Sequence, residues 1–294
     1  MPKPDFLSDH RRQWLDCCYV YPVISRRSRG LSVGVNLNID KRCNFACRYC
    51  QINRRLKREA FAVDIDVLEA ELRAVLSSAA DGTIWDEERF GATPEKFRRI
   101  NDIAFSGDGE PTTVENFPQA VAAAAHVKAE LGLDEVQIVI ITNATRLGSE
   151  TFATALEILR ENNGHIWAKL DAGTDDYFQR VNRPHPPMTL DAICGNITHV
   201  ARDYPVIIQT LWMLIDNRPP TRGEISAYID RLNAITAAGG QIEAVHLHTI
   251  ARPPAMADVA MLPNDQLDKI AQAVATGTNL PTHPFYGKPT QPQG

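Results

Sequence analysis

Short apolar runs alternate along the chain with longer stretches of helical periodicity. Six runs rich in β-forming residues, several of them apolar at nearly every position, predict strands that are covered on both faces. These runs are Leu31–Asn38, Asp102–Ser106, Val136–Thr142, His165–Leu170, Val206–Ile215 and Ile242–Thr249. Between and after them, apolar residues recur at the spacing of an amphipathic helix. The predicted helices are Asp64–Ser78, Glu115–Leu131, Glu150–Asn162, Leu190–Asp203, Arg222–Ala238 and about Asp265–Ala275.

Strands that alternate with helices predict βαβ units and a parallel sheet. A partial barrel of six units and a doubly wound open sheet both fit the pattern. In either fold, functional groups lie where strands end and helices begin. We expect one domain over residues 30–287, with an insertion at 79–101, an N-terminal extension at 1–29 and a mobile Pro/Gln/Gly tail at 288–294.

The composition is that of an ordinary globular protein. The 294 residues include 31 Lys and Arg against 36 Asp and Glu, a formal net charge of −5, and 44% are hydrophobic. These values exclude a disordered chain, a collagen and a coiled coil. The sequence has no apolar run long enough for a membrane helix, and no apolar segment of a secretory signal follows the first residues. We therefore expect a cytoplasmic protein with no membrane partner. The negative charge argues against a large RNA-binding surface.

Three of the six cysteines fall within eight residues. Cys43, Cys47 and Cys50 follow the first predicted strand, and spacings of four and three let their thiolates wrap one metal centre. Three ligands are one short of a complete iron–sulfur cluster and leave one iron open. A zinc site with a ligand from elsewhere, or three unrelated buried cysteines, also fits this spacing. The cysteines for which we expect no part in a metal site are Cys17, Cys18 and Cys194.

The pattern Cys-x3-Cys-x2-Cys, with Tyr49 before its last cysteine, resembles the signature of the radical S-adenosylmethionine (radical SAM) enzymes. The resemblance implies a partial (β/α)6 TIM-like barrel and a [4Fe–4S] cluster held by Cys43, Cys47 and Cys50. It also implies that SAM binds the open iron and is cleaved to a 5′-deoxyadenosyl radical. The backbone at Tyr49 would meet the adenine, and an external flavodoxin- or ferredoxin-like protein would donate the electron.

Three further segments at predicted strand ends resemble SAM-binding parts of that family. After the second strand, a Gly-Asp-Gly-Glu segment stands where the family carries a Gly-Gly-Glu-like motif for the SAM amino group, and either acid could take that role. Thr142 and Asn143 end the third strand, where the family contacts the ribose, and Lys169 resembles the residue that meets the SAM carboxylate. The residues assigned to the amino-group segment are Ser106, Gly107, Asp108, Gly109 and Glu110.

Each of these segments also has a structural interpretation. The glycine-rich segment fits a tight turn with a helix-capping acid. Asn143 fits a strand-ending turn, and Lys169 fits an ion pair with Asp171, which shares its face of the strand.

The resemblance extends to a subgroup, the small Fe–S oxidoreductases related to wyosine-synthesis enzymes of tRNA. It covers about Tyr21 to Tyr286 and includes the ranges 105–112, 169–171 and 180–184 and Arg252-Pro253-Pro254. Members of that subgroup make a tRNA base one candidate substrate. The acidic charge of the chain favours a small anionic metabolite or a peptide instead.

Arginines lead proline-rich loops after three successive strands. Arg183, Arg218 and Arg252 each precede proline, and three guanidinium groups at one sheet edge would suit a phosphate or carboxylate. Ordinary loops with solvated arginines fit equally well. Four further candidates for substrate contact sit in pairs on one face of the first and sixth strands: Asn36 and Asn38, and His246 and His248. A basic segment, Arg48 with residues 54–58, fits either a solvated helix face or a local nucleic-acid contact.

Overall fold

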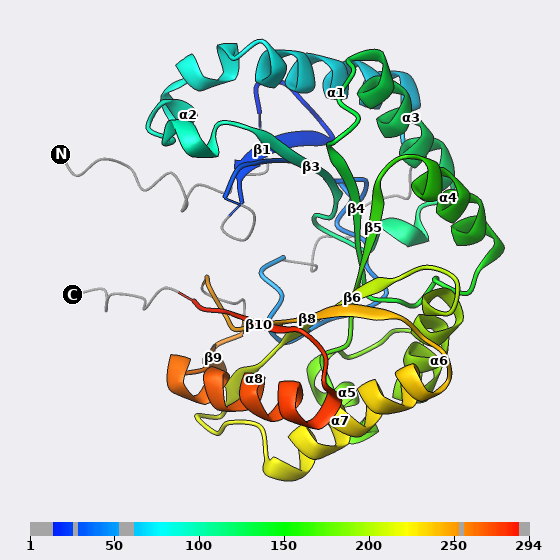
Figure 1. Ribbon diagram of the computed structural model, residues 1–294, viewed down its shortest axis with the longest axis vertical. Coiled ribbons are helices and arrows are strands. Elements are labelled where there is room, and N and C mark those ends of the chain that lie inside the picture. Colours follow the sequence, from blue (N-terminus) through cyan, green and yellow to red (C-terminus); the bar gives the residue numbers. More distant parts are fainter. Residues whose placement is uncertain (1–13, 26–28, 53–61, 253–255, 288–294) are drawn as a thin grey trace. The chain divides into compact units, whose positions relative to one another are not determined.

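The structure, a computed structural model, describes residues 14–25, 29–52, 62–252 and 256–287 (Figure 1). Its chain divides into two units, which we describe separately. The first comprises Met1–Arg42, Arg58–Ile141 and Ser149–His165. The second comprises Cys43–Lys57, Thr142–Gly148 and Ile166–Gly294.

The first unit is built on a sheet of four neighbouring strands. They are β1 (Val20–Ile24), β2 (Leu31–Val35), β3 (Ile100–Phe105) and β4 (Gln137–Thr142). β1 runs antiparallel to β2, whereas β2, β3 and β4 are parallel to their neighbours. Every residue of β2 is buried, including the polar Ser32, as expected for a parallel strand that is covered on both faces.

Helices α1 (Ile65–Ala80), α3 (Phe117–Glu130) and α4 (Glu150–Glu161) pack side by side in this unit (Figure 1). Asp64 caps α1 by accepting from the Val67 amide, and Ser149 caps α4 in the same way. The predicted insertion at 79–101 folds into short helical segments that bury Trp85 and Phe90. These segments are η1 (Thr83–Asp86), α2 (Glu88–Gly91) and η2 (Glu95–Phe97).

The second unit has four parallel strands and a separate antiparallel pair. The parallel strands, in sheet order, are β5 (Gly164–Lys169), β6 (Val206–Leu211), β8 (Ile242–His248) and β10 (Thr282–Phe285). The antiparallel pair is β7 (Met213–Ile215) with β9 (Val259–Met261). Val245 and Leu247 are fully buried, while the alternating His246 and His248 are partly exposed, so β8 has one covered and one open face.

Helices cover the second unit's strands in chain order (Figure 1): α6 (Leu190–Ala201) packs on β6 and on α7 (Arg222–Ala237), and α8 (Asn264–Thr278) packs on α7, β8 and β10. The short α5 (Asp175–Val181) precedes α6. Thr221 caps α7 by accepting from the Glu224 amide, as its capping-box spacing predicts. The Glu224 carboxylate instead accepts from the Gly173 and Thr174 amides before α5. In the described part of the chain, no helix combines the length and apolar character required to cross a membrane.

The six predicted strands are present, with differences at the edges. The run Val206–Ile215 is not one strand: it breaks at Trp212, whose amide donates to the His248 carbonyl, and β7 then pairs with β9. The segment predicted as an N-terminal extension contributes β1 to the first unit's sheet. The sequence did not predict β9, β10 or α5, since each of these elements is too short to show a clear hydrophobic period. Residues 1–13 and 288–294 lie outside the described residues.

Candidate cofactor site

The three clustered cysteines lie in one loop, residues 43–50, which we call the cysteine loop. All three side chains are partly buried, and each sulfur accepts an N–H hydrogen bond. The Phe45 amide lies 3.4 Å from Cys43 Sγ, and the Ile52 amide 3.5 Å from Cys50 Sγ. For Cys47 the donor is a side chain, described below. N–H donors of this kind surround the thiolate ligands of iron–sulfur clusters and tune their potentials.

The cysteine loop is held by residues that come more than 130 positions later in the chain. The Arg48 amide donates to the Val181 carbonyl at 2.8 Å, and the Ala46 amide lies 3.2 Å from the Asn182 carbonyl. At the other end, the His185 amide donates to the Asn44 carbonyl at 2.7 Å. The segment 181–185 therefore fixes the path of the loop backbone on both sides of Cys47.

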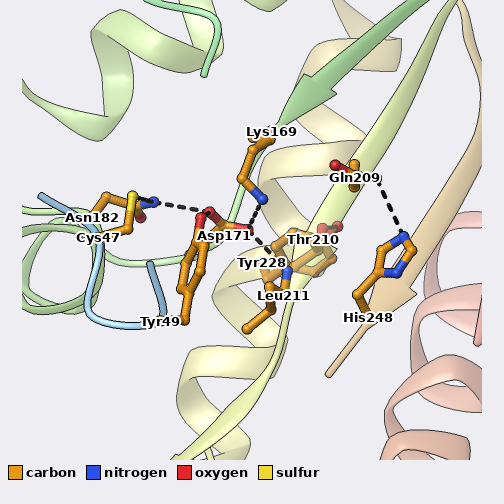
Figure 2. A network of polar contacts seen from close by, with 10 residues as sticks. All are labelled: Cys47, Tyr49, Lys169, Asp171, Asn182, Gln209, Thr210, Leu211, Tyr228 and His248. Carbon is orange, nitrogen blue, oxygen red and sulfur yellow. Dashed lines mark hydrogen bonds and ion pairs between the residues drawn. The ribbon is translucent and has the colours of Figure 1, made fainter. Parts of the chain in front are cut away.

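A buried carboxylate, Asp171, organises the side chains beside the cysteine loop (Figure 2). Its side chain is inaccessible to solvent. Oδ2 accepts from Tyr49 Oη at 2.5 Å and from Asn182 Nδ2 at 2.8 Å. Oδ1 accepts from the Leu211 amide at 2.9 Å and from Lys169 Nζ at 3.3 Å. Four donors fill the four lone-pair sites of a carboxylate, which is what a charge needs to be buried.

Asn182 connects this carboxylate to the cysteines. Its Nδ2 lies 3.7 Å from Cys47 Sγ as well as 2.8 Å from Asp171 Oδ2. Lys169 Nζ stands 5.1 Å from the centre of the Tyr49 ring, a cation–π contact. The ion pair between Lys169 and Asp171 that the sequence offered as one interpretation is therefore present. A SAM contact by Lys169 stays a prediction.

Burial, followed by the charges of Asp171 and Cys43, raises the pKa of the Cys47 thiol to about 12. Burial and the charge of Asp171 also raise the pKa of the Tyr49 phenol well above its usual value. Tyr49 therefore stays protonated and donates to Asp171. Cys47 stays a thiol unless a cation at its sulfur stabilises the thiolate, and this is the charge that iron brings.

The residues present fit an iron–sulfur cluster in the chemistry of their donors: three thiols in one loop, each with an N–H group at its sulfur. Within the described ranges, no three His, Cys, Asp or Glu side chains are grouped to hold a single metal ion. A cluster does not require that grouping, because each cysteine binds a different iron.

Asn143, predicted to contact the SAM ribose, belongs to a closed ring of side-chain hydrogen bonds with Asn44 and Thr145. Asn143 Nδ2 donates to Asn44 Oδ1 at 2.7 Å, Asn44 Nδ2 donates to Thr145 Oγ1 at 2.8 Å, and Thr145 Oγ1 donates to Asn143 Oδ1 at 2.8 Å. Thr142 Oγ1 accepts from the Ala144 amide. The strand-ending turn is therefore present, and it anchors the residue that follows Cys43.

In the first unit, residues 106–110 form the loop after β3, which we call the glycine loop. Gly107 has φ +148°, and a Cβ there would lie 2.4 Å from Asn36 Oδ1. A Cβ on Gly109 would lie 1.9 Å from the Arg42 carbonyl oxygen and 2.5 Å from Asn38 Cβ. Both glycines are therefore required by close approach of the end of β2 and the segment after it.

The two acids of the glycine loop differ in exposure. Glu110 is 3% exposed and accepts from the Thr112 amide and hydroxyl, so it caps the short helix η3 (Pro111–Thr113). Asp108 is partly exposed, and its amide donates to Asn36 Oδ1 at 3.0 Å. The helix-capping interpretation thus holds for Glu110. Asn36 and Asn38, predicted to contact substrate, are buried beside this loop.

The predicted histidines belong to an aromatic group on the open face of the second unit's sheet. His246 has ring centres of Trp167, His283 and Phe285 at 5.7, 5.8 and 5.0 Å. His248 stacks on Phe285 at 4.8 Å. Its Nε2 lies 3.3 Å from Gln209 Nε2.

The three loop arginines have different surroundings. Arg218 lines a cavity of about 590 Å³ whose wall also includes Arg180, which pairs with Asp216 at 3.0 Å. Arg183 is exposed, with Nη1 3.4 Å from Met256 Sδ. Arg252 is partly buried. The prolines after Arg252 and the basic residues 54–58 lie outside the described residues; Arg48 pairs with Asp258 at 2.9 Å.

Two residues of the site were not predicted as such. Asp171 was noted as sharing a strand face with Lys169 and as part of the range 169–171 that resembles the subgroup, but nothing in the sequence showed that it is fully buried. Asn182 lies within the range 180–184 that resembles the subgroup, which is the one signal that pointed to it.

Comparisons with known proteins found a matching family and relatives similar in sequence. The profile of the radical SAM superfamily matches residues 37–218. UPF0026 protein MJ1312 from Methanocaldococcus jannaschii is 27% identical over 238 residues, which are 79% of this chain and 63% of that protein. The present chain therefore spans less than two thirds of that relative.

Two solved structures show the fold. SuiB from Streptococcus suis, bound to S-adenosylmethionine, superimposes with a TM-score of 0.57 at 12% identity, over 87% of this chain and 50% of that one. A radical SAM methyltransferase from Sphaerobacter thermophilus gives 0.58 at 16% identity, over 90% and 68% of the respective chains. The predicted α/β fold of the partial-barrel type is thereby confirmed.

Proposed function

The chain belongs to the radical SAM superfamily, and we propose that it is an enzyme that uses a [4Fe–4S] cluster and SAM to abstract hydrogen from a substrate. The observation that carries the proposal is the cysteine loop, in which three thiols at the family spacing each receive an N–H donor. The cofactors of the family are the cluster and SAM, and SuiB is a relative in fold with SAM bound.

Cys43, Cys47 and Cys50 would hold the cluster. Bound there and reduced, the cluster would supply the electron for the cleavage of SAM to methionine and a 5′-deoxyadenosyl radical, and this radical would take a hydrogen atom from the substrate. The protein's part is to bind, to orient and to exclude water. Tyr49 is held through Oη by Asp171, so its backbone is fixed next to the last cysteine.

We assign SAM contacts to the residues that resemble the family's. The glycine loop (Ser106, Gly107, Asp108, Gly109 and Glu110) is assigned to the SAM amino group by its resemblance to the family's motif. Within it we favour Asp108 over Glu110 for the SAM amino group, because Glu110 is buried and caps η3. Thr142 and Asn143 are assigned to the ribose, and Lys169 to the carboxylate.

The substrate is a small anionic metabolite, a peptide or a tRNA base. The aromatic group around His246 and His248, together with Gln209, offers stacking surfaces and hydrogen-bonding groups on an open sheet face. Arg183, Arg218 and Arg252 offer positive charge, and Asn36 and Asn38 offer amides. Resemblance to the subgroup related to wyosine synthesis favours the tRNA base. An external flavodoxin- or ferredoxin-like protein would supply the electron, in the cytoplasm.

Anaerobic reconstitution with iron and sulfide tests the proposal. We expect brown protein that absorbs near ~400 nm, holds about four irons per chain and releases 5′-deoxyadenosine from SAM after reduction. Cys43→Ala, Cys47→Ala and Cys50→Ala should each lose most of the iron. Cys18→Ala and Cys194→Ala are matched controls that should keep it.

The alternative function is a zinc-binding structural or regulatory protein without SAM chemistry. It predicts colourless protein with stoichiometric zinc that leaves SAM intact after reduction, and that result would replace our proposal.

A further inference from the structure

The Asn182 side-chain amide lies between two acceptors, the Asp171 carboxylate at 2.8 Å and Cys47 Sγ at 3.7 Å. The residue is 3% exposed, so water does not compete for these bonds. An amide NH2 group has two hydrogens, so it can donate one to each acceptor.

Its orientation is fixed by its surroundings. A flipped amide would place Oδ1 against a carboxylate and a sulfur, both of which are acceptors, so Nδ2 must face them. Oδ1 has no hydrogen-bond partner among the described residues. The Asn182 carbonyl accepts from the Ala46 amide, next to Cys47, so backbone and side chain hold the same part of the cysteine loop.

Asp171 in turn holds Asn182. Since the carboxylate is anchored by Tyr49, Lys169 and the Leu211 amide, its position does not depend on Asn182. The donors to Cys43 and Cys50 are backbone amides, which mutation leaves in place. The N–H donor to Cys47 is instead a side chain, so a single substitution can remove it.

We propose that Asn182 is a positioning residue that raises the reduction potential of the cluster through its hydrogen bond to Cys47 Sγ. The inference rests on the proposed function. An electron added to the cluster increases the negative charge on its sulfurs, and the positive end of an N–H dipole stabilises that charge. The Asp171 carboxylate, to which the same amide donates, opposes the added electron.

The test is a redox titration of the reconstituted protein, followed by the electron paramagnetic resonance signal of the reduced cluster. In Asn182→Leu, which keeps side-chain volume and removes both polar atoms, we expect the ratio of reduced to oxidised cluster at a fixed potential to fall about tenfold. Such a fall is a shift of about 59 mV to more negative potential for a one-electron couple. Asn196→Leu is the matched control, because the Asn196 amide donates to the carbonyls of Ala144 and Thr145 and not to sulfur. It should leave the potential unchanged.

If Asn182→Leu does not fold, the isosteric variant Asn182→Asp can be titrated in its place. It replaces the donor by an acceptor, so the potential should fall at least as far. An unchanged potential in a folded Asn182 variant would overturn the inference, and so would loss of the cluster from folded variants, because Asn182 would then be needed for assembly. Wild-type protein that forms no cluster would instead overturn the proposed function itself.

Discussion

The cysteine loop and the glycine loop both follow parallel strands, and they are held in place in opposite ways. Side chains and backbone from distant parts of the chain hold the cysteine loop: Tyr49 and Asp171, which share a hydrogen bond, are 122 positions apart. The glycine loop is held mainly by close packing: the Arg42 carbonyl and the Asn38 side chain leave no room for a Cβ on Gly109, and the Asp108 amide adds one hydrogen bond to a side chain. The first loop depends on a satisfied buried charge, the second on the absence of side-chain atoms.

Because of this difference, a substitution disrupts each loop by a different mechanism. A buried carboxylate with four donors gives strong and directional support, but removing it leaves every donor without its partner. Close packing of glycine has no such network, and its failure is steric. Substitutions in the two loops should therefore destabilise the protein by different amounts and for different reasons.

Asp171→Ala should have the largest effect. It removes the acceptor of the Leu211 amide, Tyr49 Oη, Asn182 Nδ2 and Lys169 Nζ at once. Breaking a buried charged network of this kind costs about 3–5 kcal/mol in the free energy of unfolding. Urea denaturation of the protein without cofactors measures it. Asp230→Ala, at an exposed site on α7, is the control and should stay within about 0.5 kcal/mol. A loss for Asp171→Ala no greater than this control would show that the network does not support the fold.

Gly109→Ala should come next. The added Cβ would overlap the Arg42 carbonyl oxygen, which is backbone and cannot rotate away, so the segment after β2 must shift. Overpacking typically costs about 1–3 kcal/mol. Gly195→Ala is a matched control, because a Cβ at this position on α6 meets no atom within 4 Å. It should stabilise the protein by up to about 1 kcal/mol, the helix-propensity difference between the two residues. Equal stability of the two variants would contradict the close approach at Gly109.

The two loops also show how much of the fold and the site could be predicted from the sequence. The strands before them follow from hydrophobic pattern, and their functional ends follow from the rule that sites lie at the carboxyl ends of parallel strands. Cys43, Cys47 and Cys50 follow from spacing within one segment. Gly107 and Gly109 were assigned to SAM, and Asn36 and Asn38, the neighbours that leave no room for a Cβ at these positions, were assigned to substrate.

The remaining support for the site is long-range, and local pattern does not contain it. That Asn182 lies next to Cys47 depends on the path of 181–185 along the cysteine loop. Likewise, the Glu224 carboxylate accepts from an amide just before α5, and not from its own helix α7, because Gly173 lies next to it. Short elements were not predicted either: β10 has four residues, too few to show a hydrophobic period.

Asn143→Ala should have the smallest effect, and it separates two roles for one residue. The substitution removes the hydrogen bonds of Asn143 with Asn44 and Thr145. Each such bond contributes about 1 kcal/mol, so we expect a loss of about 1–2 kcal/mol in protein that contains no SAM. Asn233→Ala removes an exposed amide that donates to the Gly277 carbonyl, and should lose less. A SAM contact alone would leave the stability of the SAM-free protein at the control value and would appear only as weaker SAM binding. A loss in both measurements would mean that Asn143 has both roles: it anchors Asn44 beside Cys43 and it contacts SAM.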